Sequence, residues 1–562
     1  MKVGTGMSLP RQHPYIDRLK TLFAAGRIGR RDFLREATLL GVAAGAAYAF
    51  VDRVSGRTAP QTAQTAQVTR PRGGRVRIGL RVADVGRPHR FSWWEPEIAR
   101  QVLSSLTKTG PDNITRPHLL ERWDVSDDLR SWTLFLRPDL RWRKGGRLVA
   151  DHVIWNLRQV LDPAVGSPAL GLMGSYMLSD SGAGANGTAP GLWDANAIEK
   201  VDDLTLRLNL RRPQVAVPQH LQHGTLGIQD PEEGGVFGPG SNGAGPFDLV
   251  EIEPGRGALL RAVADYWEGV GPYLDAVEFV DTGDDPAAAV AALAERRVDG
   301  LYRTDIHYLD AIKGLDHLRI YEAESSWTAV ARMKVTEKPF DDPRVRRAMR
   351  LAIDPHAVLR VAHAGMGLPG EHHHVCAIQL DYARLPFMSR DVAAARRLLA
   401  DAGYPDGFAT EITVKRDPPW ELLAVEEMVR QWKEAGVRVR IKMAPTALFW
   451  ELWDKVPFGF TEWAHDSLGI INLGLGYRSG APWNESGYAN PEFDTLLNEA
   501  EGLLDLEARR AVMARIERLL QEDGPIVQPL WLGVFTAYDK RVQGFTLYPN
   551  RAIHANELAI EV

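Results

Sequence analysis

The sequence predicts a two-lobed α/β protein, and three observations lead to that fold class. The 562 residues are too many for one hydrophobic core and fit two or three domains. Segments with strand alternation and segments with helical spacing are interleaved along the chain. The strands after Gly524 come too late to form a domain of their own. We therefore expect them to return to the N-terminal sheet, so that the chain crosses twice between two lobes.

Four segments show the alternation of apolar and polar residues that is typical of β-strands. They are residues 75–80, 132–136, 204–210 and 437–443. The second of them ends at Pro138, which cannot donate a backbone hydrogen bond to a neighbouring strand. We expect all four to lie in sheets.

Helices are predicted where apolar residues recur every three or four positions and where start or stop residues frame them. They cover residues 98–106, 150–160 with Asp151 as the N-cap, 343–353, a short helix from Asp354, 391–402, 422–435, 490–500 and 512–520. The aromatic-rich stretch 461–494 contains five glycines, so we expect it to be mostly loop or broken strand.

Composition excludes several classes of protein. Hydrophobic residues make up 45% and charged residues 25%, which is ordinary for a globular protein. The net charge of −5 gives no sign of a nucleic-acid partner. The single cysteine, Cys376, excludes an intramolecular disulfide framework and a thiolate metal cluster. Sixteen tryptophans are many, and such rings are often used in ligand pockets.

The N-terminus carries the features of an export signal. Residues 27–35 read RIGRRDFLR, and the apolar run 37–51 has the length of a signal-peptide core rather than of a spanning helix. Residues 47–49, Ala-Tyr-Ala, offer a cleavage site. The pattern resembles the twin-arginine signal, which delivers folded proteins to the bacterial periplasm, although Gly29 stands where Ser or Thr is usual. The alternative is a core helix that begins at Asp32.

We accordingly expect a signal peptide over residues 1–50 and a flexible linker over 51–71, which is rich in Thr, Gln, Ala and Pro. No cysteine follows the apolar run, so we expect an exported, soluble, periplasmic protein rather than a lipoprotein. Its export partner would be the twin-arginine machinery.

Five stretches of the chain resemble one family. They are residues 121–163, Gly243–Phe247, Asp265–Trp267, Lys338–Ala348 and Tyr488–Asp494. These match, in order, a strand followed by an aromatic–basic–Gly turn, then Gly-x-Gly-Pro-Tyr, Asp-Tyr-Trp, Pro-Phe-Asp-Asp and Tyr-x-Asn-Pro motifs. The chain thus resembles the family 5 extracellular solute-binding proteins of ABC transporters, which bind dipeptides, oligopeptides and nickel.

The resemblance implies a periplasmic-binding-protein type II-like α/β fold with an extra subdomain inserted in the first lobe. Lobe I would comprise residues 72–299 and 524–562, and its insert would comprise residues 108–210. Lobe II would comprise residues 300–523. A small ligand would bind between the lobes.

The resemblance also implies a function. The protein would capture a small ligand, with a short peptide as the first choice, and deliver it to an ABC permease in the inner membrane. We expect a monomer with no cofactor. Alternatives are another solute (a nickel complex, an opine or a sugar), a sensor or chaperone role on the same scaffold, and an exported hydrolase.

Candidate ligand-binding residues come from the stretch 461–494 and from two other segments. In peptide-binding relatives an aspartate shortly after a tryptophan-containing segment pairs with the ligand's α-ammonium, and Asp466 follows Trp463 in this way. Asp466 could equally cap the next turn. The full set of candidates is Trp463, His465, Asp466, Trp483, Trp327, Arg478 and His373.

The run His372–His374 is the sequence's most metal-like feature, because imidazoles suit nickel, zinc or copper. Adjacent residues of a strand point to opposite faces, however, so three in a row need a special loop to share one ion. We therefore predict no metal site and place His373 in the lining of the cleft. No nucleophile or paired acid and base emerges from the motifs, so we predict no catalytic residue.

Overall fold

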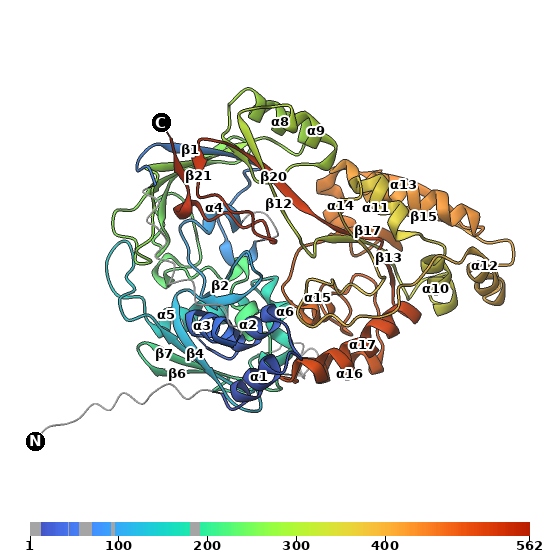
Figure 1. Ribbon diagram of the computed structural model, residues 1–562, viewed down its shortest axis with the longest axis horizontal. Helices are drawn as coiled ribbons and strands as arrows, with labels where there is room; N and C mark the ends of the chain where they lie inside the picture. Colours follow the sequence, from blue (N-terminus) through green and yellow to red (C-terminus); the bar gives the residue numbers. More distant parts are fainter. Residues whose placement is uncertain (1–12, 43, 55–69, 92–95, 180–190, 562) are drawn as a thin grey trace, which may run out of the picture.

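The computed structural model describes residues 13–42, 44–54, 70–91, 96–179 and 191–561. Most of the predicted linker lies outside these ranges. The described chain forms a seven-stranded sheet, a second seven-stranded sheet and a four-stranded sheet, all flanked by helices (Figure 1). Among the described residues, none of the helices combines the length and the apolar character that a membrane crossing requires.

The first large sheet forms the centre of lobe I. Its strand order is β12 (Leu318–Ala323), β20 (Val534–Asp539), β11 (Gly300–Leu301), β1 (Arg75–Leu80), β10 (Ala276–Asp281), β9 (Gly257–Ala262) and β8 (Phe247–Glu253). β1 runs parallel to β10 and β11. Val76, Ile78 and Phe279 are fully buried within it, so the predicted alternation of residues 75–80 is confirmed. Helices α8 (Pro286–Ala294) and α9 (Leu309–Lys313) follow β10 and β11.

The four-stranded sheet belongs to the predicted insert. Its order is β4 (Leu120–Val125), β5 (Ser131–Leu136), β7 (Thr205–Asn209) and β6 (Ile198–Asp202), and it packs with α5 (Ala150–Leu161) and α6 (Ala169–Met177). The N-cap of α5 is Val149, not the predicted Asp151. Asp151 lies in the first turn and forms an ion pair with Lys200 at 2.6 Å. The helix predicted over residues 98–106 is only α4 (Pro96–Ala99).

The second large sheet forms the centre of lobe II. Its order is β14 (Gly367–Pro369), β19 (Leu530–Leu532), β13 (Thr328–Met333), β17 (Phe458–Trp463), β15 (Ala409–Lys415) and β16 (Arg438–Ala444), and β18 (Ile526–Val527) pairs with β13. The helices around it are α10 (Pro343–Leu351), α11 (Pro355–His363), α12 (Val392–Asp401), α13 (Pro419–Glu434), α14 (Thr446–Leu452), α15 (Gly469–Gly476), α16 (Pro491–Glu501) and α17 (Leu506–Glu522).

The chain passes between the two large sheets twice, at 323–328 and at 532–534. The predicted lobe boundaries put these crossings at 299–300 and 523–524. β11 and β12 in fact pair within the lobe I sheet, and β18 and β19 pair within the lobe II sheet. Alternation along a segment predicts a strand but does not tell which sheet the strand joins, and this is why the predicted boundaries differ.

The glycine-rich stretch 461–494 contains a helix where a loop was predicted. In α15, a Cβ on Gly476 would lie 2.9 Å from Cη2 of Trp463, and one on Gly469 would lie 2.6 Å from Cγ1 of Val375. These glycines therefore allow close packing of the helix against its neighbours. They do not interrupt the helix.

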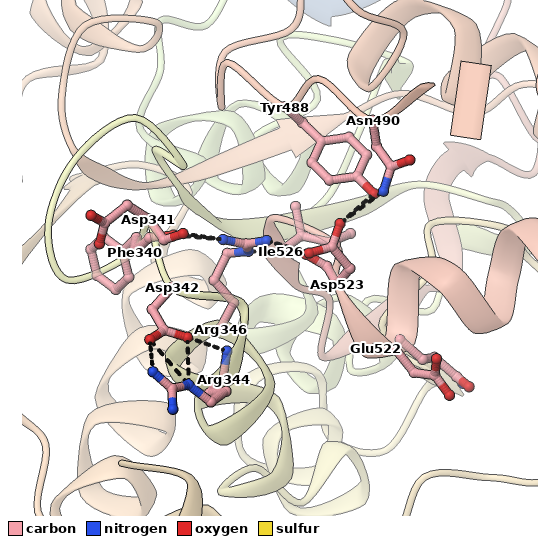
Figure 2. A network of polar contacts seen from close by, with 12 residues as sticks. Phe340, Asp341, Asp342, Arg344, Arg346, Tyr488, Asn490, Glu522, Asp523 and Ile526 are labelled. Atoms are coloured by element: carbon pink, nitrogen blue, oxygen red, sulfur yellow. Dashed lines mark hydrogen bonds and ion pairs between the residues drawn. The ribbon is translucent and has the colours of Figure 1, made fainter. Parts of the chain in front are cut away.

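Two of the family-like motifs meet at one carboxylate, Asp523, at the end of α17 (Figure 2). The guanidinium of Arg346, from the Pro-Phe-Asp-Asp stretch, forms an ion pair with Asp523 at 2.6 Å and donates to the backbone oxygen of Phe340 at 2.8 Å. Tyr488 and Asn490, from the Tyr-x-Asn-Pro stretch, donate to the other carboxylate oxygen at 2.9 and 3.1 Å. These motifs therefore hold α10, α16 and α17 of lobe II together.

We predict that Arg346→Met lowers the free energy of unfolding by about 2–3 kcal/mol, because it removes the cationic partner of Asp523 and the donor to the backbone oxygen of Phe340. Arg344→Met is the matched control on the same helix, since its ion pair with Asp342 is half-exposed and is expected to contribute little to stability. Urea unfolding of both variants measures the difference. Equal destabilisation would contradict the role given to Arg346.

Candidate ligand-binding cleft

The strand ends of both lobes point at one gap. In lobe I the parallel strands β1, β10 and β11 end at this gap, and in lobe II β15 runs parallel to both β16 and β17 and ends there as well. Ligands of open α/β sheets bind outside the carboxyl ends of the strands. The gap holds a cleft of about 1110 Å³, part of it open to solvent. Residues of both lobes line it: Gly79–Arg81, Thr282–Pro286 and Tyr302–Ile306 from lobe I, and Lys415, Asp417, Trp420, Thr446 and Glu462 from lobe II.

On the lobe II side the cleft is built on a buried charged triad. Nζ of Lys415, at the end of β15, lies 2.8 Å from Oε1 of Glu421 and 3.0 Å from Oε2 of Glu462. All three side chains are almost fully buried. Burial works against the charge of Lys415, but the two carboxylates outweigh it and raise its pKa, while burial raises the pKa of Glu421 to about 8. At neutral pH the carboxyl group of Glu421 is therefore mostly protonated, and the carboxylate of Glu462 remains ionised.

On the lobe I side three arginines line the cleft, and Arg81 among them is paired with Asp284, whereas Arg303 and Arg551 lie further along the wall. Arg303 follows β11, and Arg551 lies in the C-terminal segment between β21 (Val542–Gln543) and β22 (Ala559–Ile560). Together with Trp327, Trp450 and Glu462 they line a narrower recess that adjoins the main cleft. The guanidinium of Arg551 lies over the ring of Trp327, 4.5 Å from its centroid.

Asp466 is the predicted ligand residue with the most unusual surroundings. Ser326 Oγ and Gln379 Nε2 donate to its backbone oxygen at 3.0 Å, which holds this part of the chain in place. Its carboxylate has no hydrogen-bond or ion-pair partner within the described part of the chain. Burial raises the pKa of Asp466 to about 8. Such a group is ready to gain a cationic partner.

His465 lies next to Asp466 and joins the two halves of the molecule. Its Nδ1 accepts from the backbone N–H of Ser326 at 3.0 Å, so the proton lies on Nε2, which donates to Oδ1 of Asn113 at 3.0 Å. Asn113 belongs to the insert, between β2 (Thr107–Thr109) and β3 (Thr115–Pro117). Burial lowers the pKa of His465 to about 3, so it stays neutral.

Three other predicted residues are engaged with neighbouring side chains. Trp463 is 3% exposed, and its indole N–H donates to Glu485 at 3.3 Å. Trp483 packs edge-to-face on Trp463 with their centroids 6.1 Å apart. Arg478 forms an ion pair with Glu501 at 2.7 Å, next to α16. The structure does not bring these three side chains to the wall of the cleft that Trp327 lines, and their contact with ligand stays a prediction.

The histidine run folds as a buried turn with positive φ angles at His372 and His374. Burial lowers the pKa of each of the three imidazoles to about 3. His374 Nδ1 lies 2.6 Å from the Tyr477 hydroxyl, and His373 Nε2 lies 3.7 Å from Glu371 and from Glu517. Within the described residues, no set of three His, Cys, Asp or Glu side chains is arranged to hold a metal ion.

Sequence reasoning missed Lys415, Glu421, Glu462, Arg303 and Arg551. A local signal existed for two of them, since Lys415 and Glu462 are charged residues at or next to the carboxyl ends of β15 and β17, where both strands are buried. The arginines carry no such signal, because Arg303 and Arg551 are far apart in sequence and meet only in the fold.

The N-terminal helices α1 (Tyr15–Ala24), α2 (Arg30–Leu39) and α3 (Ala44–Val54) pack against the insert and α17 (Figure 1). Trp123 of the insert donates to the backbone oxygen of Leu39 at 2.9 Å, and Arg509 of α17 forms a fully buried ion pair with Glu36. Arg30 and Arg31 of the twin-arginine pattern are exposed. These contacts do not test the signal-peptide assignment, which stays a prediction.

Two lobes, each with its parallel strands ending at a shared cleft, and two connections between them define a two-lobed ligand-binding protein. Residues 115–482 match the family described as bacterial extracellular solute-binding proteins, family 5. The match covers well over half of the chain, and the protein belongs to this family. As predicted from the five stretches, it is a solute-binding component of an ABC importer, a class that delivers its ligand to a membrane permease.

Known proteins agree with this assignment. The chain is 24% identical over 453 residues to the glutathione-binding protein GsiB of Pectobacterium atrosepticum, covering 77% of this chain and 83% of GsiB. It is 22% identical over 488 residues to the dipeptide-binding protein DppE of Bacillus subtilis, covering 81% of this chain and 86% of DppE. Among solved structures, DppA of Helicobacter pylori in complex with the peptide STSA superposes on this chain with a TM-score of 0.75 at 18% identity. The superposition covers 89% of this chain and 100% of DppA. The predicted fold class is confirmed.

We predict that Glu36→Gln weakens the docking of α1–α3 by about 3–5 kcal/mol, because Arg509 would keep its buried charge without its partner. Hydrogen exchange of the amides in α2 and α3 measures the docking. The control is Asp32→Asn on the same helix, whose pair with Arg510 at 3.3 Å is partly exposed and contributes about 1 kcal/mol or less. Unchanged protection in Glu36→Gln would contradict the prediction.

Proposed function

We propose that this solute-binding protein works in the periplasm and captures a short peptide through its α-ammonium group. The observation that carries this proposal is the carboxylate of Asp466, which is partly buried and has no hydrogen-bond or ion-pair partner among the described residues. A ligand ammonium would form a charge-assisted hydrogen bond with it and restore its ionised form. The relatives named for glutathione and dipeptides carry ligands of the same chemical class.

The surroundings of Asp466 fit this role. Its backbone is fixed by Ser326 and Gln379, so the carboxylate is positioned before the ligand arrives. Ser326 also orients His465, whose Nδ1 accepts from the backbone N–H of Ser326 and whose Nε2 reaches Asn113 in the insert. Of the seven predicted residues, we assign direct ligand contact to Asp466 and Trp327. We assign to His465 and Trp463 the positioning of the segment that carries Asp466.

The export route belongs to the same proposal. The twin-arginine pattern at Arg30-Arg31, with its apolar run and cleavage site, supports export of the folded protein to the periplasm. The protein would then pass its ligand to an inner-membrane permease after closure of the lobes, as a hinge-type population shift.

We predict that binding of a dipeptide or tripeptide at pH 7 releases close to one proton. The folded pKa of Asp466 is raised to about 8, so the carboxyl group is mostly protonated without ligand and must ionise to pair with the ammonium. For the same reason its contribution to the stability of the ligand-free protein falls as the pH rises from about 4 towards 8. Calorimetric titration in buffers of different ionisation enthalpy measures the released proton.

Asp466→Asn removes the titrating group while keeping its shape. We expect this variant to release no proton and to bind peptides more weakly by about 2–5 kcal/mol. Asp454→Asn, an exposed aspartate of the same lobe, is the control and is expected to bind as the parent does. Peptide binding of undiminished affinity in Asp466→Asn would overturn the role of Asp466, and failure of every peptide to bind the parent would overturn the peptide assignment.

A further inference from the structure

The N-terminal helices α1, α2 and α3 form a small bundle with an aromatic core of their own. The ring of Phe33 in α2 lies 5.1 Å from that of Phe23 in α1 and 5.2 Å from that of Phe50 in α3, measured between centroids. Arg30 of α2 also forms an ion pair with Asp52 of α3 at 3.3 Å. Aromatic pairs contribute to stability beyond the area that they bury. The three helices are therefore held to one another and dock as a unit.

The charges of this bundle are complementary to those of α17. Basic residues of the bundle lie opposite acidic residues at the N-terminal end of α17, and acidic residues of α2 lie opposite arginines one turn further along. Four ion pairs of the described residues join the two: Arg18–Asp505, Arg27–Glu507, Asp32–Arg510 and Glu36–Arg509. The last pair is fully buried on both sides, so breaking it is costly, whereas the three more exposed pairs contribute less.

The bundle also fits closely against the insert. Gly41, between α2 and α3, has a φ of +83°, and a Cβ at this position would lie 2.4 Å from the backbone oxygen of Trp123. Only glycine allows both the conformation and the approach. The indole N–H of Trp123 donates to the backbone oxygen of Leu39, and the hydroxyl of Tyr48 donates to Oδ2 of Asp112, both at 2.9 Å. The apolar run of the predicted signal is thus part of a packed interface.

The predicted cleavage site lies inside this interface. Residues 47–49 belong to α3, Ala47 is 1% exposed, and Tyr48 is hydrogen-bonded to the insert. A peptidase needs the chain around the bond to be accessible and extended, so α3 must undock and unwind before it is cut. When such opening is fast, the rate of cleavage follows the population of the opened form.

We infer that the N-terminal bundle stays attached to the folded protein and that its docking masks the Ala-Tyr-Ala site from cleavage. Two features carry this inference: the buried pair of Glu36 with Arg509, and the close approach of Gly41 to Trp123. A segment that is only removed needs neither of them. The inference rests on the proposed twin-arginine export for one step, because that route carries proteins already folded, with the bundle docked. It is independent of which ligand binds.

The test exposes the purified full chain to bacterial signal peptidase I, in a detergent that leaves the unfolding temperature of the parent protein unchanged. Cleavage after Ala49 is followed by intact mass, and hydrogen exchange of the α3 amides reports on docking in the same preparation. We expect the parent to keep its N-terminal segment and its α3 amides to be protected.

Two variants loosen the docking from opposite sides. Arg509→Met removes the partner of Glu36 and leaves the whole segment, and so the peptidase substrate, unaltered. Gly41→Ala places a Cβ against Trp123 and leaves the rest of the protein unaltered. We expect each to be cut at least about 10-fold faster than the parent, with faster exchange in α3.

Arg515→Met is the matched control on α17, because its pair with Glu499 at 3.9 Å is about half exposed and joins α16 instead of the segment. It is expected to be cut as slowly as the parent. Unfolding curves establish that each variant is folded. Should Arg509→Met not fold, Gly41→Ala still provides the test.

The outcomes separate this inference from the proposed function. Cleavage of the folded parent as fast as that of the two variants would overturn the masking, and so would folded variants that exchange faster in α3 but are still not cut. Unchanged exchange in both variants would overturn the role given to their contacts. Peptide binding is measured on the intact parent, and its absence would overturn peptide capture and leave the masking standing.

Discussion

A hydrogen-bonded ribbon of two strands runs from one lobe into the other, and the geometry of the cleft depends on it. In lobe I, β12 pairs with β20 in a register that places Ala323 opposite Val534. In lobe II, β13 pairs with β19, with Thr328 opposite Trp531. Between these pairs, the backbone N–H of Leu532 donates to the oxygen of Trp327 at 2.8 Å. The two connections between the lobes are therefore hydrogen-bonded to each other and act as one unit, which keeps the strand ends of both sheets directed at the same space.

The two lobes contribute different charged groups to the cleft between them. Lobe I contributes two arginines that have no acceptors of their own among the described residues. Lobe II contributes the Lys415 triad, whereas Asp466 is not among the residues that line the cleft or the adjoining recess. Each lobe therefore presents its own charged groups to the shared space. A ligand that contacts both lobes would couple its capture to their movement.

Much of the fold could be predicted because its signals are local. Alternation predicted the strands of residues 75–80, 132–136, 204–210 and 437–443, and Asp354 and Asn490 cap their helices as their positions before proline suggest. What could not be predicted depends on contacts between distant residues. The crossing points depend on which sheet β11, β12, β18 and β19 join, and the helix α15 depends on the space that Trp463 and Val375 leave for its glycines. Asp466 and Trp327 were accessible through the family resemblance, whereas Arg551 joins Trp327 only through the tertiary structure.

The N-terminal helices also affect the relative position of the two lobes, because α2 contacts both lobe II and the insert of lobe I. Arg35 donates from one nitrogen to the backbone oxygen of Ile378 in lobe II at 2.9 Å, and from another to that of Asp112 in the insert at 3.4 Å. Glu36, the next residue, is bound to Arg509 of α17. Both contacts of Arg35 can form only in one relative arrangement of the insert and lobe II, so docked helices favour that arrangement over others. Docking of the N-terminal segment and the relative position of the lobes are therefore coupled. Detachment of the segment would remove the contacts of Arg35 and so allow more relative arrangements of the lobes.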